Sequence, residues 1–214
     1  MSDAGLFEVI HSTRSMRRFK SEPVAMELLW KVLDAGIRAP SGQNTQPWTF
    51  LLVREAQGKQ FIGSRYQSVF NKAFAGRRPA AGDNSASARG MRAAIQLAEN
   101  MQQVPALLLV CGVRDWPFAV KEEHRVGKAP PSYGSIYPCV QNILLACRAL
   151  GLGATLTTMH QLFEDELHEH FGIPDDYGIV ALIPIGYPEG NFGPVRRQPV
   201  AEATCFEHWN QRQL

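Results

Sequence analysis

The sequence predicts an α+β fold, because helical and strand-like segments alternate along the chain without the regular units of a doubly wound sheet. Residues 23–39 carry apolar side chains at intervals of three and four, which is typical of an amphipathic helix. Residues 104–113 and 177–188 are apolar runs of the length expected for buried strands. The chain of 214 residues, 45% of them hydrophobic and 20% charged, is expected to form a single domain over 1–214.

Helical and strand-like patterns divide the N-terminal half of the chain. The second helix is expected to stop at Pro40, because proline cannot continue a helical hydrogen-bond ladder. Residues 76–90 are rich in Gly, Ala and Ser and show no hydrophobic period, so we expect a mobile loop or lid there. The expected helices are 5–12, 23–39, 55–75 and 91–102, and the expected strands are 48–53 and 104–113.

The C-terminal half is more apolar and ends in a polar tail. Residues 135–153 form a predicted helix that is apolar nearly all round, which indicates burial in the core or at a subunit interface. The tail 189–214 is polar, with Phe206 and Trp209 as isolated apolar side chains, and such a tail often packs on another surface. The remaining expectations are a long irregular connection at 114–134, a strand or tight turn at 154–159, a short helix at 163–172 and the last core strand at 177–188.

Charge and composition exclude several classes of protein. A formal net charge of +2 is too small for a general attraction to nucleic acid. The longest apolar run, at 104–113, is far below the ~20 residues that a membrane-spanning helix needs. The four cysteines show no paired spacing, so we expect reduced thiols in a cytoplasmic protein.

Cations gather in the stretch RSMRRFK, at residues 14–20. Arginine presents a planar fork that pairs with phosphate oxygens, and a serine hydroxyl adds a donor. If the segment is extended, alternate residues share a face, which would place Ser15 with Arg17 on a phosphate that Arg14 wraps. The alternative is a solvated basic patch beside a helix.

A second polar cluster, APSGQNTQPW, follows the helix that ends before Pro40. Ser41 and Asn44, with two neighbouring glutamines, offer hydroxyl and amide groups that suit the donor and acceptor edge of a flavin ring. The alternative is a polar turn, which the same residue types favour. A third segment, GPVRRQPV, carries Arg196 and Arg197 between prolines and could return to the same phosphate.

Together these segments resemble the FMN-dependent nitroreductase superfamily, including its flavin-reductase and iodotyrosine dehalogenase-like branches. The matching stretches are TRSMRRF, APSGQNTQPWTF, VQNILLACRALGLGATLTT and LIPIGYPEG with the later RRQP. They occur in the family's order and cover most of the chain, leaving roughly 55–90 and 114–134 unmatched. Thr13 stands where the family often has a further arginine.

The resemblance implies roles for individual residues. It implies phosphate or ribityl contacts for Arg14 and Ser15, and a contact with the flavin edge for Arg17. The full implied set of FMN-binding residues is Arg14, Ser15, Arg17, Pro40, Ser41, Asn44, Leu156, Thr157, Thr158 and Arg197. In this set residues 40–44 come from the second subunit, residues 156–158 line the flavin's reactive edge, and Arg197 closes the phosphate site. Thr158 is the nearest match to a threonine whose hydroxyl favours one-electron steps in the dehalogenase-like branch.

The implied fold is a mostly antiparallel sheet flanked by helices, in an intertwined homodimer with FMN at the interface. The tail 200–214 would embrace the partner, and the region 55–90 would form a lid or substrate side. The implied activity is reduction of nitroaromatic, quinone or related small electrophilic acceptors, with NADH or NADPH as donor and a ping-pong mechanism. No residue is expected to act as nucleophile or general acid, because the cofactor carries the chemistry.

Several alternatives remain open at this point. One is a non-catalytic flavin-binding protein that stores FMN or senses redox state; others are flavin-fragmenting or dehalogenating members of the same fold. The lid region offers Tyr66 and Lys72 without a well-placed glutamate, which disfavours halotyrosine as the substrate.

Two further motifs lack the features of a dinucleotide-binding site or a metal site. The stretch GLGATL lacks the third glycine and the preceding strand of a dinucleotide-binding motif. His160, His168 and His170 lack the spacing of metal ligands, so we expect solvated histidines and no metal.

Overall fold

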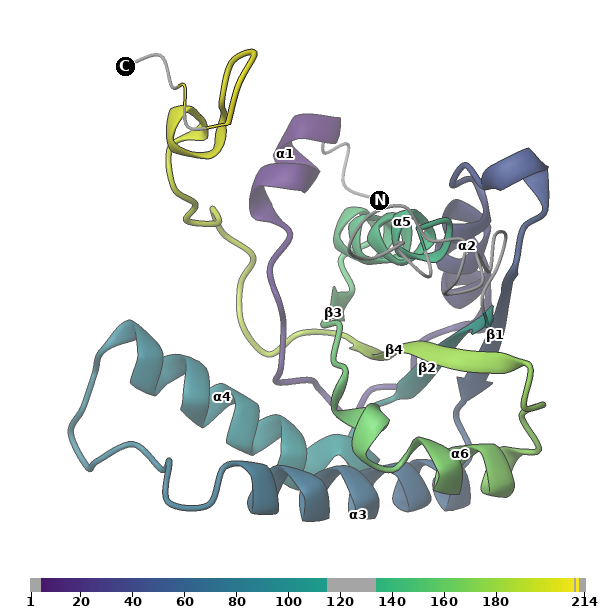
Figure 1. Ribbon diagram of the computed structural model, residues 1–214. Coiled ribbons are helices and arrows are strands. Elements are labelled where there is room, and N and C mark those ends of the chain that lie inside the picture. The colour runs from purple at the N-terminus through teal and green to yellow at the C-terminus, as the bar shows by residue number, and fades with distance from the viewer. Residues whose placement is uncertain (1–4, 115–133, 210, 212–214) are drawn as a thin grey trace.

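The computed structural model describes residues 5–114, 134–209 and 211, and its centre is an antiparallel sheet. The strands pair in the order β1-β2-β4-β3, and every pairing between neighbours is antiparallel (Figure 1). Their bounds are Trp48–Val53 for β1, Ala106–Val113 for β2, Gly153–Ala154 for β3 and Tyr177–Gly186 for β4. The predicted α+β class and the mostly antiparallel sheet are confirmed.

Helices cover both faces of the sheet. In Figure 1, α2 and α5 lie above it and α3, α4 and α6 lie below it. The helix bounds are Leu6–Ser12 for α1, Met26–Ile37 for α2, Ala56–Ala73 for α3, Ala86–Asn100 for α4, Ile136–Ala149 for α5 and Glu164–Phe171 for α6. None of the described helices is long and apolar enough to cross a membrane.

The sheet separates two hydrophobic cores. Along β2, Leu108 and Val110 face α2 and α5, whereas Leu107 and Leu109 face the layer of α3, α4 and α6. All four side chains are fully buried. Because both faces are covered, β2 is apolar at successive positions instead of alternating with polar residues. Burial of each such side chain stabilises the fold by roughly 1.5–3 kcal/mol.

Helices α2 and α5 approach closely at Gly36. A Cβ atom built there would lie 2.8 Å from Ile143 Cγ1, so only glycine fits without movement of the neighbouring helix. Close by, the Asn142 side chain donates a hydrogen bond of 3.1 Å to the carbonyl of Ala35. The predicted central helix is therefore buried in the core of its own chain along this side.

The region expected to be a loop or lid is partly helical. Helix α4 starts at Ala86, so residues 86–90 belong to it, and the expected loop is confined to residues 76–85. Ser85 caps the helix: its hydroxyl oxygen accepts from the backbone N–H of Ala88 at 3.2 Å. The cap and the packing of Ala88 in the protein interior outweigh the weak hydrophobic period of this stretch. Preceding it, α3 buries Ile62, Tyr66 and Phe70 and is part of the second core.

Three further predictions concern the connection at 114–134, the C-terminal tail and the cysteines. The expected connection at 114–134 lies almost entirely outside the described residues. In the tail, Phe206 is 43% and Trp209 85% exposed, so neither is buried against its own chain. No disulfide occurs among the described residues, and three of the four cysteines are buried; the cytoplasmic location stays a prediction.

Candidate functional site

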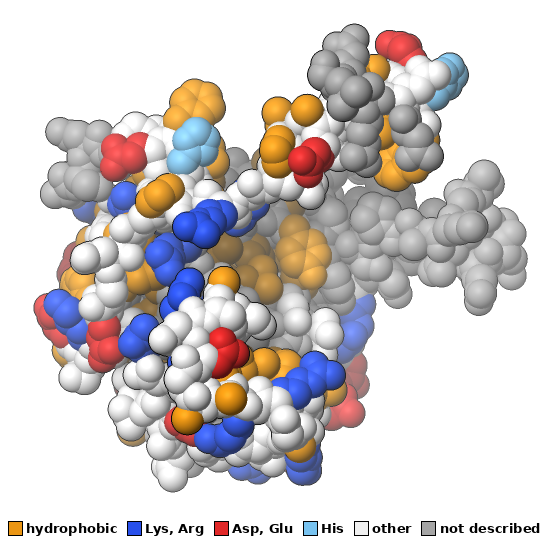
Figure 2. Space-filling view, turned by 90° about the vertical axis from the view of Figure 1, so that its left-hand side faces the viewer, with side chains coloured by type: hydrophobic (Ala, Val, Ile, Leu, Met, Phe, Trp, Pro, Cys, Tyr) orange, Lys and Arg blue, Asp and Glu red, His pale blue; other side chains and the backbone are white. Residues whose placement is uncertain are grey.

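A cleft of about 390 Å³ opens between α1, α5 and β3. Four of the residues predicted to bind a cofactor line it: Arg14, Ser15, Leu156 and Arg197. Figure 2 shows Lys and Arg side chains gathered across this face of the molecule, with hydrophobic side chains in the hollow behind them. Segments far apart in the sequence thus supply one cationic and partly apolar site.

The segment after α1 carries Arg14 and Ser15 into the cleft. At the end of α1, the Thr13 hydroxyl donates to the carbonyl of Val9 at 2.6 Å, and the chain then becomes extended. The backbone N–H of Met16 donates to the Ala154 carbonyl at 3.0 Å. Met16 is buried, and this backbone bond ties the segment to β3, beside the cleft.

Arg17 departs from the arrangement expected for an extended segment. It lines a neighbouring cavity of about 80 Å³ together with Arg18, whereas Ser15 lines the larger cleft with Arg14. Ser15 and Arg17 thus line different cavities, and the expectation that they share one phosphate stays a prediction. The bridge between Phe19 and Pro188 fixes the far end of the segment against the chain after β4.

The segment 193–197 returns to the same cleft, as its arginines suggested. The backbone N–H of Val195 donates to the His11 carbonyl at 2.9 Å, and both Val195 and Arg197 line the cleft. The Arg197 guanidinium donates to the carbonyl of its neighbour Arg196 at 2.8 Å, and its side chain is exposed. Arg197 and Arg14 thus line the same cleft although they are far apart in sequence.

Several polar groups of this site have no partner among the residues that the structure describes. Within residues 5–114, 134–209 and 211, neither Arg14 nor Arg17 forms an ion pair with a carboxylate. The hydroxyl oxygen of Thr155, another cleft residue, is buried and has no hydrogen-bond partner in the same part of the chain. Free cations and an unpartnered buried hydroxyl are what a site for an anionic, oxygen-rich ligand requires.

The turn after β3 is anchored at Thr157. Its backbone exchanges two hydrogen bonds with Leu182 of β4, at 3.0 and 3.1 Å. Its hydroxyl oxygen lies 2.9 Å from the Tyr66 hydroxyl, which comes from α3. Burial raises the pKa of Tyr66, and the hydrogen bond to Thr157 and the charge of Arg17 oppose that rise. Thr158 is exposed at the start of the following 3₁₀ turn, Met159–Leu162.

Pro40, Ser41 and Asn44 do not line this cleft of their own chain. They form a compact turn in which the Ser41 hydroxyl oxygen accepts from the backbone N–H of Gln46 at 3.0 Å. Asn44 has a positive φ of 54°, a left-handed conformation that asparagine tolerates better than most residues. The stretch is therefore a polar turn, which was one of the two alternatives, and its contact with a flavin stays a prediction.

Sequence reasoning missed Thr155 and Gln141 and placed Tyr66 in the lid region. Thr155 and Gln141 line the cleft, and Tyr66 holds Thr157. Thr155 sits inside the stretch already singled out, and the strand before it was the only signal for its burial. Gln141 and Tyr66 lie in helical segments whose polar positions gave no sign of which side faces the site.

The prediction of solvated histidines is wrong for His160. This side chain is fully buried, and its Nε2–H donates to the Ile179 carbonyl at 2.7 Å. Burial lowers the pKa of His160. The 3₁₀ turn folds back beneath β4, which the spacing of the histidines could not reveal. No group of metal-ligating side chains occurs among the described residues.

Comparison with known proteins identifies the family. The family model described as "Nitroreductase family" matches residues 10–187, so the chain belongs to the nitroreductase family. An NADH dehydrogenase of Thermus thermophilus is 27% identical over 195 residues, covering 90% of this chain and 91% of the relative.

Solved structures share the fold. Oxidized iodotyrosine deiodinase bound to FMN and 3-iodo-L-tyrosine superposes with a TM-score of 0.71 at 24% identity, covering 97% of this chain and 100% of the other. A nitroreductase with bound FMN from Desulfitobacterium hafniense gives a TM-score of 0.67 at 22% identity, with 97% and 100% coverage. The chain therefore has the nitroreductase-like fold that its motifs predicted.

Proposed function

We propose that this protein is an FMN-dependent NAD(P)H oxidoreductase that reduces nitroaromatic, quinone or related electrophilic acceptors by a ping-pong mechanism. The observation that carries the proposal is the cleft in which Arg14, Ser15 and Arg197 converge beside Leu156. The family match and the FMN-bound structures of the same fold support the choice of cofactor.

The cleft residues fit FMN by their chemistry. Two guanidinium groups and a serine hydroxyl suit the phosphate. Ile10, Leu144 and Leu156 line the same cleft and offer an apolar surface for the ring. Thr155 supplies a buried hydroxyl that has no hydrogen-bond partner in the part of the chain that the structure describes. In this proposal Arg17 and the turn at 157–158 stand at the ring's reactive edge.

The second half of the site would come from a second copy of the chain. Exposed apolar side chains on α1 and α2 support a homodimer: Phe7 is 72% and Trp30 63% exposed. An apolar groove runs beside Trp30, between α2 and β1. Pro40, Ser41 and Asn44 would then reach the partner's FMN, and the tail 200–214 would embrace the partner. The loop 76–85 with the start of α4 would form the substrate side.

When bound, FMN supplies a ring that takes up a hydride and passes it on. The protein's part is to hold the phosphate, to orient the ring and to place a fixed positive charge near it. Arg17 would supply that charge and stabilise negative charge that develops on reduction. Donor and acceptor would take turns at the exposed ring face, and no side chain is needed as nucleophile or general acid.

Dehalogenation is the second candidate, because an iodotyrosine deiodinase shares the fold. The chain's own substrate side disfavours it: Tyr66 is buried and bonded to Thr157, so it cannot clamp an amino-acid substrate. Storage of FMN and redox sensing are the outcomes that the test below distinguishes from reduction of an acceptor.

The test is an absorption spectrum of the purified protein after addition of FMN and desalting, followed by NADH and then NADPH without oxygen. We expect flavin bands that stay with the protein, bleach with a nicotinamide donor and return with menadione or nitrofurazone. Retained flavin that neither donor reduces would favour storage or sensing. Loss of all flavin on desalting would contradict the proposal.

A further inference from the structure

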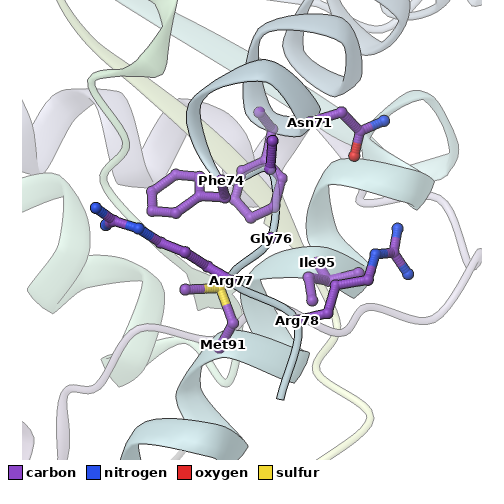
Figure 3. A pocket seen from close by; sticks show the side chains of 9 residues that line it. Asn71, Phe74, Gly76, Arg77, Arg78, Met91 and Ile95 are labelled. Atoms are coloured by element: carbon purple, nitrogen blue, oxygen red, sulfur yellow. The ribbon is translucent and has the colours of Figure 1, made fainter. Parts of the chain in front are cut away.

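A separate pocket of about 300 Å³ lies between the end of α3 and α4. Figure 3 shows Phe74 at its centre, with Met91 and Ile95 of α4 facing it and Arg77 and Arg78 extending on either side. No residue of this pocket lines the cleft described above. The pocket combines an apolar, aromatic interior with two cations at its mouth.

The two arginines are held at the pocket by a tight turn. After α3, the backbone N–H of Arg77 donates to the Phe74 carbonyl at 3.1 Å, and Gly76 takes a φ of +76° that favours glycine. The Arg77 guanidinium carbon lies 5.8 Å from the centre of the Phe74 ring. Arg78 lies 3.5 Å from a carboxylate oxygen of Glu99 in a largely exposed pair. Such a pair is weak, so the Arg78 guanidinium remains available to a stronger anion.

These side chains suit a planar heterocycle that carries a phosphate group. An aromatic ring and aliphatic side chains pack against the faces of a flat ring. The Asn71 amide, at the rim in Figure 3, offers both a donor and an acceptor to the edge of such a ring. Two guanidinium groups match a phosphate dianion. A volume at the lower end of the range for ligand pockets suits one base with its phosphate and not a whole dinucleotide.

The distance between this pocket and Thr157 indicates that the pocket suits a dinucleotide donor and not a small acceptor. Tyr66, which holds Thr157, stacks with Phe70 at 6.4 Å between ring centres, and Phe70 contacts Phe74 at 4.7 Å. From residue 66 to residue 74 the helix rises about 12 Å. A small nitroaromatic acid cannot place its anion in this pocket and its reducible group beside Thr157. The two ends of a nicotinamide dinucleotide can lie that far apart.

We infer that this pocket binds the adenosine 2′-phosphate end of NADPH, and that Arg77 and Arg78 make NADPH the preferred donor. The inference rests on the proposed function, since it names the donor of the same reaction. It assigns the 2′-phosphate to the two guanidinium groups and the adenine to the surface formed by Phe74, Met91 and Ile95.

The first experiment measures binding without any hydride transfer. Isothermal titration calorimetry of the FMN-loaded protein compares 2′,5′-ADP with 5′-AMP, which lacks the 2′-phosphate. We expect 2′,5′-ADP to bind at least tenfold more tightly. Arg77→Gln and Arg78→Gln should each weaken its binding about tenfold, as expected for loss of one charge-assisted hydrogen bond, and leave 5′-AMP unchanged. Arg65→Gln is the matched control, because it removes a positive charge from α3 that pairs with Glu166 in the natural chain. It should change the binding of neither 2′,5′-ADP nor 5′-AMP.

The second experiment compares kcat/KM for NADPH and NADH with menadione as acceptor. The natural chain should prefer NADPH, and the Arg77→Gln/Arg78→Gln double variant should lose that preference through a lower kcat/KM for NADPH. Equal binding of 2′,5′-ADP and 5′-AMP, or a preference that survives the double variant, would overturn the inference even if both donors are oxidised. Failure to oxidise either donor would instead contradict the proposed function, and the calorimetry would still decide the pocket.

Arginine-dependent binding of 4-nitrobenzoate without binding of 2′,5′-ADP would also overturn the inference. That result would assign the pocket to an anionic acceptor.

Discussion

The hydroxyl oxygens of Tyr66 and Thr157 lie 2.9 Å apart, although the two residues are 91 positions apart in sequence. This contact joins α3, in the lower helical layer, to the turn that follows β3 beside the cleft. Tyr66 is only 4% exposed, and among the described residues its hydroxyl has Thr157 as its hydrogen-bond partner. This hydrogen bond therefore connects α3 to the turn that follows β3.

Tyr66→Phe should destabilise the protein by about 1 kcal/mol, because it removes one buried hydrogen bond and leaves the Thr157 hydroxyl without that partner. The measurement is urea unfolding of the natural chain, Tyr66→Phe, Thr157→Val and the double variant. We expect the double variant to be less destabilised than the sum of the single changes, since both remove the same interaction. Strict additivity would contradict a direct contact between the two hydroxyls.

Arg14→Gln should weaken FMN binding at least tenfold, because one charge-assisted hydrogen bond contributes about 1.5–3 kcal/mol. The quenching of flavin fluorescence on titration gives the Kd. Arg38→Gln is the matched control: Arg38 is exposed, pairs with Asp34 and does not line the cleft. Equal affinities for both variants would remove Arg14 from the proposed phosphate site.

Gly36→Ala should destabilise the protein by roughly 1–3 kcal/mol, because the added methyl group would lie 2.8 Å from Ile143 Cγ1 in a packed core. The matched control is Gly90→Ala in α4, where a Cβ atom meets nothing within 4 Å. That change should stabilise the protein by up to about 1 kcal/mol through helix propensity. Thermal unfolding of both variants tests the opposite signs, and a stabilising Gly36→Ala would refute the close approach of α2 and α5.

Stability should fall as the pH is lowered through the ordinary pKa of histidine, 6.5, because burial holds the pKa of His160 below that value. In this range the unfolded chain binds a proton that the folded chain does not, so the free energy of unfolding rises with pH. The check is urea unfolding at pH 7.5 and pH 5.5 for the natural chain and for His160→Gln. The variant should show a smaller difference between the two pH values, and an unchanged difference would mean that other groups cause it.

Local sequence patterns were sufficient to predict most of the helices and strands. The apolar runs at 104–113 and 177–188 became β2 and β4, and the periodic segment at 23–39 became α2. Boundaries were less predictable where a single cap decides them, as at Ser85, whose hydroxyl starts α4 within a stretch that otherwise reads as a loop.

The candidate site was predictable in its parts but not in its grouping. Arginine and serine beside a helix end indicated a phosphate site, and Arg14, Ser15 and Arg197 do line one cleft. The separation of Arg17 from Ser15 was not predictable, because it depends on backbone pairing of the 13–20 segment with residues after β3 and β4. The burial of His160 likewise depends on how a 3₁₀ turn meets β4.

The sequence by itself determined the family, the α+β class and the residue types that are proposed to bind phosphate, because these follow from ordered motifs and local hydrophobic periods. The tertiary structure alone decided which side chains meet: Arg14 with Arg197, Tyr66 with Thr157, and two arginines with an aromatic pocket between α3 and α4. The physical reason is that local periodicity selects helices and strands, whereas long-range packing and backbone hydrogen bonds select their partners.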